Sequence, residues 1–93
     1  MIDVNEYFEG NVKSLGYRTT KGKSTVGVMV SGDYEFGTST HETMSVIEGE
    51  LVVLLPGEKE TKSFKNGDVF EVNANEKFKV KATVDTAYLC VYK

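Results

Sequence analysis

The chain has 93 residues, which is enough for one domain spanning residues 1–93 and leaves no material for a second hydrophobic core. Hydrophobic residues make up 40% of the sequence and charged residues 27%, and no apolar run approaches the roughly 20 residues of a membrane span. The net charge is −3, whereas binding to a nucleic-acid backbone needs clustered lysine and arginine. We therefore expect a globular protein that binds neither a membrane nor a nucleic acid.

Cys90 is the only cysteine, so the chain cannot form an internal disulfide. An unpaired cysteine fits the reducing cytoplasm and argues against a disulfide-stapled secreted scaffold. Residues 1–6 also lack the basic segment and following apolar stretch of a secretory signal. These features predict a cytoplasmic protein in which Cys90 is a reduced, buried packing residue of the last strand.

Taken in order, the chain shows short strand patterns separated by polar or glycine-containing turns, and no convincing helix. Residues 2–8 resemble a short extended segment over one end of the core, and residues 11–17 a strand broken at Gly16. The polar stretch 17–23 predicts a turn region. Alternating valines predict a strand at 24–30, and another strand is expected at 34–38.

The second half of the chain continues the same pattern. A strand from residue 42 to a turn at 48–50 is followed by strands at 51–55, 61–65, 68–72, 77–84 and 86–92. Asn66-Gly67 is the strongest short hairpin signal in the chain. About nine short strands without helices indicate an all-β fold, an antiparallel sandwich or barrel of the jelly-roll kind.

Three lysines cluster weakly near the end of the sequence. They alternate with apolar residues over positions 77–82, which is typical of a strand with one buried face and one solvated face. We therefore interpret Lys77, Lys79 and Lys81 as an outer surface that also discourages edge pairing, and not as a nucleic-acid site.

Glu42 is the least expected residue in a strand position. With a period of two, Glu42 shares a face with Met44 and Val46, so a carboxylate lies on the apolar side of the strand. An ionised carboxylate in such a place is costly unless it is paired, hydrogen-bonded or reached through a cavity, and these are properties of binding sites. Alternatively, the strand has only begun at this point and Glu42 points into water.

Several segments resemble known sequences. Glu42, followed by six residues and Gly49, resembles the end of the first cupin motif, G-x5-H-x-H-x3,4-E-x6-G, and Gly67-Asp68-x-Phe70 resembles the start of the second. The whole chain resembles the small one-domain pyrimidine/purine nucleoside phosphorylase family. The segments that carry this resemblance are Val12 to Tyr17, Val26 to Met29, Tyr34-x-Phe36-x-Thr38, Glu42 to Gly49, Leu54-Leu55-Pro56 and Tyr88 to Tyr92.

This resemblance implies a cupin-type antiparallel jelly-roll barrel and an enzyme. The expected reaction is phosphorolysis, in which purine and pyrimidine ribonucleosides react with phosphate to give a free nucleobase and α-D-ribose 1-phosphate. Phosphate is a co-substrate here, and no cofactor is expected. A two-fold homodimer is also expected, both by resemblance and because sheet edges need to be covered.

The chain departs from metal-binding cupins at the ligand positions. Counting back from Glu42, the two motif histidines fall on Phe36 and Thr38, or on Glu35 and Gly37 with the longer spacer, and the second motif places a histidine at Phe78. Only Glu42 remains of the four usual ligands, whereas a transition-metal site gathers three or more. His41 has the opposite parity from Glu42, which favours a surface position over a ligand or proton-shuttle role. We expect no bound metal.

The predicted pocket is a barrel mouth lined by six residues. Glu42 is the candidate catalytic residue, able to contact the pentose and stabilise positive charge on the sugar, and burial should raise its pKa. The aromatic members should stack on any base without reading its edge. The alternative is that the apolar members are ordinary core residues. The predicted lining residues are Phe36, Thr38, Glu42, Met44, Phe70 and Phe78.

The sequence gives the least information about the phosphate site. No glycine-rich loop leads into a helix N-terminus, so the donors must be side chains or strand-edge amides. Arg18, the only arginine, is favoured for its forked geometry, with Lys13 or a neighbouring subunit as other sources; alternatively, Arg18 is a solvated loop residue. Two other functions stay open, a metal-free cupin that binds a small molecule without catalysis, and a metal-dependent oxygenase or isomerase.

Overall fold

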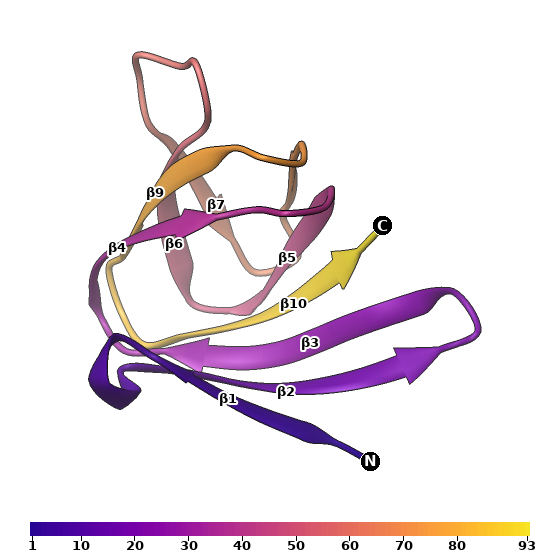
Figure 1. Cartoon of the computed structure of the whole chain (residues 1–93). Helices are drawn as coiled ribbons and strands as arrows, with labels where there is room; N and C mark the ends of the chain where they lie inside the picture. The colour runs from indigo at the N-terminus through magenta and orange to yellow at the C-terminus, as the bar shows by residue number, and fades with distance from the viewer.

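The computed structural model describes the whole chain, residues 1–93, and contains ten strands and one short 3-10 helix (Figure 1). The absence of α-helices confirms the all-β prediction. The elements are β1 (Asp3–Tyr7), η1 (Phe8–Gly10), β2 (Val12–Thr19), β3 (Gly22–Met29), β4 (Gly32–Gly37), β5 (Glu42–Glu48), β6 (Glu50–Leu54), β7 (Lys62–Lys65), β8 (Val69–Val72), β9 (Lys77–Ala82) and β10 (Thr86–Tyr92).

The strands form two antiparallel sheets. One has six strands in the order β1-β2-β3-β10-β5-β8, and the other has four in the order β4-β9-β6-β7. From β3 to β10 the chain passes repeatedly between the two sheets, which gives the jelly-roll arrangement. In Figure 1 the turn of the long β2–β3 hairpin lies on the same side of the molecule as both chain termini.

The hydrophobic core lies between the inner faces of the sheets. Met29, Leu51 and Val53 are fully buried there, and burying a side chain of this size contributes about 1.5–3 kcal/mol. Along β9 the apolar residues point inward and the three lysines at 77, 79 and 81 point outward, as their alternation predicts.

Strand β2 runs without a break through Gly16, where the sequence predicted an interruption. Gly16 pairs with Asp3 of β1 on one side and with Thr25 of β3 on the other. A glycine inside a strand costs roughly 0.5–1 kcal/mol, and the pairing of β2 on both edges outweighs this local preference.

The turn at Asn66-Gly67 is present, but the prediction of a hairpin around it is wrong. Strands β7 and β8, on either side of the turn, belong to different sheets. The Asn66 side-chain oxygen accepts a 2.8 Å hydrogen bond from the Gly49 amide, and the Gly67 amide donates a 2.8 Å bond to the Val46 carbonyl. Turn residues specify a local chain reversal, whereas the pairing partner of each strand depends on the whole fold.

Gly49, the last residue of the motif that begins at Glu42, allows the tight β5–β6 connection. Its φ is +117°, and a Cβ atom there would collide with the buried side chain of Thr86. Only glycine fits both the backbone conformation and the available space. This turn fixes where β5 ends, and therefore the register of the strand that carries Glu42.

The outer faces of the two sheets differ. Cross-strand pairing places Val4, Leu15 and Val26 side by side on the outer face of the six-stranded sheet, and they are 70%, 48% and 38% exposed. We call these three residues the apolar outer row. The four-stranded sheet instead presents charged cross-strand pairs such as Glu35 with Lys79.

Candidate active site

A cavity of about 780 Å³ lies between the inner faces of the two sheets. Its volume falls within the 300–1,000 Å³ that is usual for small-molecule sites. The six-stranded sheet contributes Glu42, Met44 and Cys90 to the wall, and the four-stranded sheet contributes Phe36 and Phe78. The cavity therefore combines a carboxylate with an aromatic wall, as the sequence predicted.

The aromatic wall is built from three phenylalanines on different elements. Phe36 of β4 pairs with Phe78 of β9, and their ring centroids are 5.7 Å apart. Phe8 of η1 meets Phe36 edge-on at 5.5 Å. Phe8 and Glu9 both have positive φ values, 52° and 60°, which few non-glycine residues adopt. The contacts of the Phe8 ring with Phe36 and Tyr34 offset this backbone strain.

Glu42 begins β5 and reaches the cavity from the six-stranded sheet. Its side chain is half-buried, and the Cys90 thiol lies 3.4 Å from its Oε1 atom as a hydrogen-bond donor. Burial raises the pKa of the Glu42 carboxyl above its ordinary value of 4.5, as expected, while the thiol hydrogen bond and nearby His41 oppose the rise. The structure thus gives Glu42 an inward position at the start of its strand.

The last strand supplies polar groups that the sequence did not assign to the site. Tyr88, Cys90 and Tyr92 alternate along β10 and all line the cavity. The Tyr92 hydroxyl lies 3.2 Å from the Thr25 hydroxyl of β3, within hydrogen-bond distance. The sequence did contain a sign of this arrangement, because alternation places two phenols and a thiol on one face of β10. Apolar residues on both faces of the strand obscured it.

Burial keeps these three groups protonated. It raises the pKa of the Tyr88 hydroxyl to about 12, and burial with the negative charge of Glu42 raises the pKa of the Cys90 thiol to about 12. The pKa of Tyr92 is also raised, mainly by burial. Cys90 is 2% exposed, which confirms that it is buried in the last strand, and its reduced state stays a prediction. It is more than a packing residue, because its thiol contacts Glu42.

Gly27 makes room for Tyr88. The two residues pair across β3 and β10, and a Cβ atom on Gly27 would lie 2.6 Å from the ring carbon that carries the Tyr88 hydroxyl. A glycine in a strand interior often marks such a close approach. The absent side chain lets the phenol lie over the sheet and form part of the cavity wall.

The structure does not bring every predicted site residue to the cavity. Phe70 is buried behind Phe78, with ring centroids 6.2 Å apart, and belongs to the core. Thr38 donates a 2.6 Å hydrogen bond to the Asn73 carbonyl and accepts a 3.0 Å bond from the Glu76 amide, so it secures a loop. Arg18 is exposed on β2 and does not form part of the wall.

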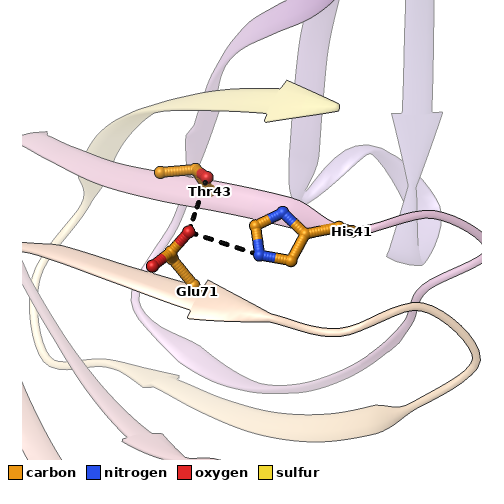
Figure 2. Close-up of polar contacts among 3 residues, drawn as sticks. All are labelled: His41, Thr43 and Glu71. Carbon is orange, nitrogen blue, oxygen red and sulfur yellow. Dashed lines mark hydrogen bonds and ion pairs between the residues drawn. The ribbon is translucent and has the colours of Figure 1, made fainter. Parts of the chain in front are cut away.

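His41 turns away from the cavity, as its parity predicts. Figure 2 shows Glu71 of β8 facing both His41 and Thr43; its Oε1 atom is 3.3 Å from His41 Nε2 and 3.4 Å from Thr43 Oγ1. His41 is partly buried, and its Nδ1 atom has no hydrogen-bond partner. This cluster holds the residues on both sides of Glu42 on the outer side of the sheet, so Glu42 is directed inward.

The residues at the cupin ligand positions cannot form a metal site together. Phe36, Thr38 and Phe78 occupy the histidine positions, and no group of three or more His, Cys, Asp or Glu side chains gathers anywhere in the structure. The cavity can bind an organic molecule by stacking and hydrogen bonding and can present one carboxylate to it. No helix in the structure is long and apolar enough to cross a membrane.

Comparisons with known proteins cover nearly the whole chain. The family model described as pyrimidine/purine nucleoside phosphorylase matches residues 2–92. A Pseudoalteromonas atlantica protein of that name is 61% identical over 92 residues, which are 99% of this chain and 99% of that protein. A solved structure of a Vibrio parahaemolyticus protein of unknown function is 42% identical, with a TM-score of 0.94 over 97% of this chain and 96% of that one.

A more distant structure identifies the fold. A cupin superfamily protein from Desulfitobacterium hafniense superposes with a TM-score of 0.73 at 14% identity, covering 95% of this chain and 82% of that one. At this identity the likeness concerns the fold alone. It confirms the predicted cupin-type jelly roll.

Proposed function

The chain belongs to the pyrimidine/purine nucleoside phosphorylase family, and from this premise we propose that it cleaves both purine and pyrimidine ribonucleosides with phosphate. The products are the free nucleobase and α-D-ribose 1-phosphate. In this reaction the glycosidic C–N bond breaks, and the base leaves with the bonding electrons and takes up the proton that hydrogen phosphate gives up. A phosphate oxygen forms the new bond to the sugar carbon.

The observation that best supports this function is the half-buried Glu42 carboxylate in an aromatic-lined cavity. Positive charge develops on the sugar as a glycosidic bond breaks, and a fixed carboxylate stabilises that charge. In the proposed complex Glu42 accepts hydrogen bonds from the pentose hydroxyls. It does not bind the phosphate, because two anions repel each other.

The aromatic wall supports broad specificity. Every nucleobase has a π face, and stacking on an aromatic side chain contributes roughly 1–3 kcal/mol per base without reading its hydrogen-bonding edge. The rings of Phe36 and Phe78 form an apolar part of the cavity wall, and Phe8 extends it. In our proposal this wall holds purines and pyrimidines alike, while Glu42 contacts the sugar that they share.

We further propose that the reaction uses no metal or other cofactor. The chemistry of the residues supports this, since the inward positions that hold metal ligands in other cupins carry aromatic or hydroxyl side chains and only Glu42 is retained. The proposed partners are small nucleosides and phosphate, and not nucleic acid or a membrane. A buried, unpaired Cys90 is compatible with the cytoplasmic location that we propose.

A homodimer is the proposed assembly. The apolar outer row is exposed, carries no charge and continues to the edge strand β1. Such a surface on a protein of this size is typical of a contact with another chain. A second copy of the chain is the occupant that we propose.

Release of base from inosine, adenosine, guanosine and uridine, each with and without phosphate, tests the proposed function. We expect release that depends on phosphate and persists after dialysis against a chelator. If none of the four nucleosides releases its base in the presence of phosphate, the remaining function is that of a binding protein without catalysis. Stoichiometric iron, manganese or zinc, with activity lost on chelation and restored by the metal, would contradict metal independence.

A further inference from the structure

Strand register places four polar side chains in one row across the inner face of the six-stranded sheet. Arg18 of β2 pairs with Lys23 of β3, and Tyr92 of β10 pairs with Glu42 of β5. The β3–β10 register, continued by one residue beyond its last pair, sets Lys23 beside Tyr92. Neighbouring strands are about 4.8 Å apart, so Lys23 and Glu42, two strands apart, are separated by about 10 Å along the sheet.

The row changes charge along its length. Two cations lie at the β2–β3 end, a neutral phenol follows, and the carboxylate lies beyond it. Lys23 and Tyr92 both line the cavity, and the Lys23 ammonium lies 5.6 Å from the centroid of the Tyr92 ring. The cavity therefore has a cationic end next to the residue that we assign to the pentose.

Building on the proposed function, we propose that this end of the cavity is the subsite for inorganic phosphate. The Lys23 ammonium and the Tyr92 hydroxyl donate to the phosphate oxygens, and Arg18 adds positive charge at the rim. Charge-assisted hydrogen bonds of this kind are roughly twice as strong as neutral ones. Phosphate held here is about one pentose width from Glu42, with the neutral phenol between the two anions.

The charge of Lys23 is available to a ligand. The ion pairs in the structure join Lys13 to Glu6, Lys62 to Glu58 and His41 to Glu71, and Lys23 takes part in none of them. Lys13, the other cation considered for phosphate, lies on the outer face of β2, 3.3 Å from Glu6, and does not line the cavity. The three lysines of β9 point away from the cavity. Lys93 also lines the cavity, and its backbone amide donates a 2.9 Å hydrogen bond to the His41 carbonyl.

Tyr92 suits the role of a neutral donor. Burial raises its pKa, so the hydroxyl keeps its proton throughout the physiological pH range. Thr25 lies within hydrogen-bond distance and fixes the orientation of the phenol. The arrangement sets the phosphate against the sugar carbon on the side facing Lys23, while the base departs along the aromatic wall formed by Phe36 and Phe78.

The test compares Lys23→Gln with Lys21→Gln. Lys21 lies in the turn of the same hairpin and does not line the cavity, so its replacement removes an equal charge nearby. At constant ionic strength, we expect Lys23→Gln to raise the KM for phosphate about tenfold to a hundredfold, the range for losing one or two charge-assisted contacts. The KM for inosine at saturating phosphate should change little, and Lys23→Arg should restore most of the phosphate affinity.

A second readout does not depend on turnover. Inorganic phosphate should raise the melting temperature of the wild type and of Lys21→Gln, and should raise that of Lys23→Gln much less. If the wild type phosphorolyses nucleosides but Lys23→Gln keeps its phosphate KM and its phosphate-dependent stabilisation, the subsite is elsewhere and this inference fails. If the wild type shows no phosphorolysis, the proposed function itself fails.

Discussion

The two sheets that enclose the cavity present different chemistry to it. The six-stranded sheet contributes hydrogen-bonding and ionisable groups, with Glu42, Cys90 and Tyr92 on adjacent strands. The four-stranded sheet contributes the rings of Phe36 and Phe78. In the function that we propose, this division separates two tasks: the rings stack on any base, and the polar groups of the six-stranded sheet act on the pentose and the phosphate, which are common to all the reactions. Under this proposal a small domain can accept many bases and still carry out a single reaction.

The largest expected effect comes from removing the negative charge of Glu42 on the six-stranded sheet. We expect Glu42→Gln to lower kcat by a factor of tens to thousands, the range for losing one preorganised electrostatic contact. Glu71→Gln is the matched control: it removes a carboxylate charge on the outer side of the same sheet but keeps an acceptor oxygen for His41 and Thr43, so it should retain most activity. Unchanged rates for Glu42→Gln on both a purine and a pyrimidine nucleoside would remove Glu42 from the mechanism.

The thermal stability of Glu42→Gln should not fall with its activity. Because burial raises the pKa of Glu42, the folded state favours the protonated carboxyl, and ionisation costs stability as pH rises through the folded-state pKa. Glu42→Gln should therefore melt at the same or a slightly higher temperature at neutral pH. This difference should disappear below the ordinary glutamate value of 4.5. A strongly destabilised Gln variant would show that the carboxylate is structural.

The aromatic sheet should affect binding more than turnover. We expect Phe36→Ala to raise the KM for inosine and uridine by about five- to a hundredfold, as expected for the loss of one stacking partner, with a smaller change in kcat. Phe64→Ala removes a ring that packs against Phe70, away from the cavity, and should reduce thermal stability without changing KM. Equal kinetic effects of the two variants would mean that Phe36 acts only through packing.

A smaller effect should distinguish the thiol from simple packing. Activity should fall at acidic pH as Glu42 becomes protonated, and the Cys90 hydrogen bond lowers the pKa of that carboxyl. Cys90→Ala should therefore shift the acidic limb of the kcat profile to higher pH, whereas Cys90→Ser, which keeps a donor, should shift it less. Identical acidic limbs in the wild type and both variants would limit Cys90 to packing.

The outer faces of the two sheets also differ, and substitutions there should have the smallest effect on activity. Leu15→Lys places a charge in the apolar outer row and should convert the proposed dimer to a monomer in light-scattering measurements, with the cavity intact. Lys79→Glu, on the charged outer face of the four-stranded sheet, should leave the assembly unchanged. A wild type that is monomeric at high concentration would contradict the dimer proposal.

Much of this molecule follows from period-two patterns. The inward direction of Glu42 and Met44 and the outward lysines of β9 could be predicted because alternation in a strand directly assigns its faces. The break at Gly16 and the hairpin at Asn66-Gly67 were wrong because local residue preferences do not specify which strands become neighbours.

The candidate site shows the same limit. The inner row from Arg18 to Glu42 joins the β2–β3 hairpin to β10 and β5, which come much later in the chain, and it becomes visible only once the pairing register is known. Sequence reasoning favoured Arg18 for phosphate but did not find Lys23, which pairs with it across β2 and β3. Tyr92 was missed because it was one of several tyrosines, and only the structure shows its position over the cavity.

A competition assay tests the central claim, that Glu42 acts on the shared sugar while the aromatic wall accepts either base. Inosine and uridine are mixed with excess phosphate, and the ratio of hypoxanthine to uracil released is measured for the wild type and for Glu42→Gln. We predict that the variant is far slower but releases the two bases in the wild-type ratio, because both substrates lose the same pentose contact. A ratio shifted tenfold or more would show that Glu42 reads the base, and would contradict the account.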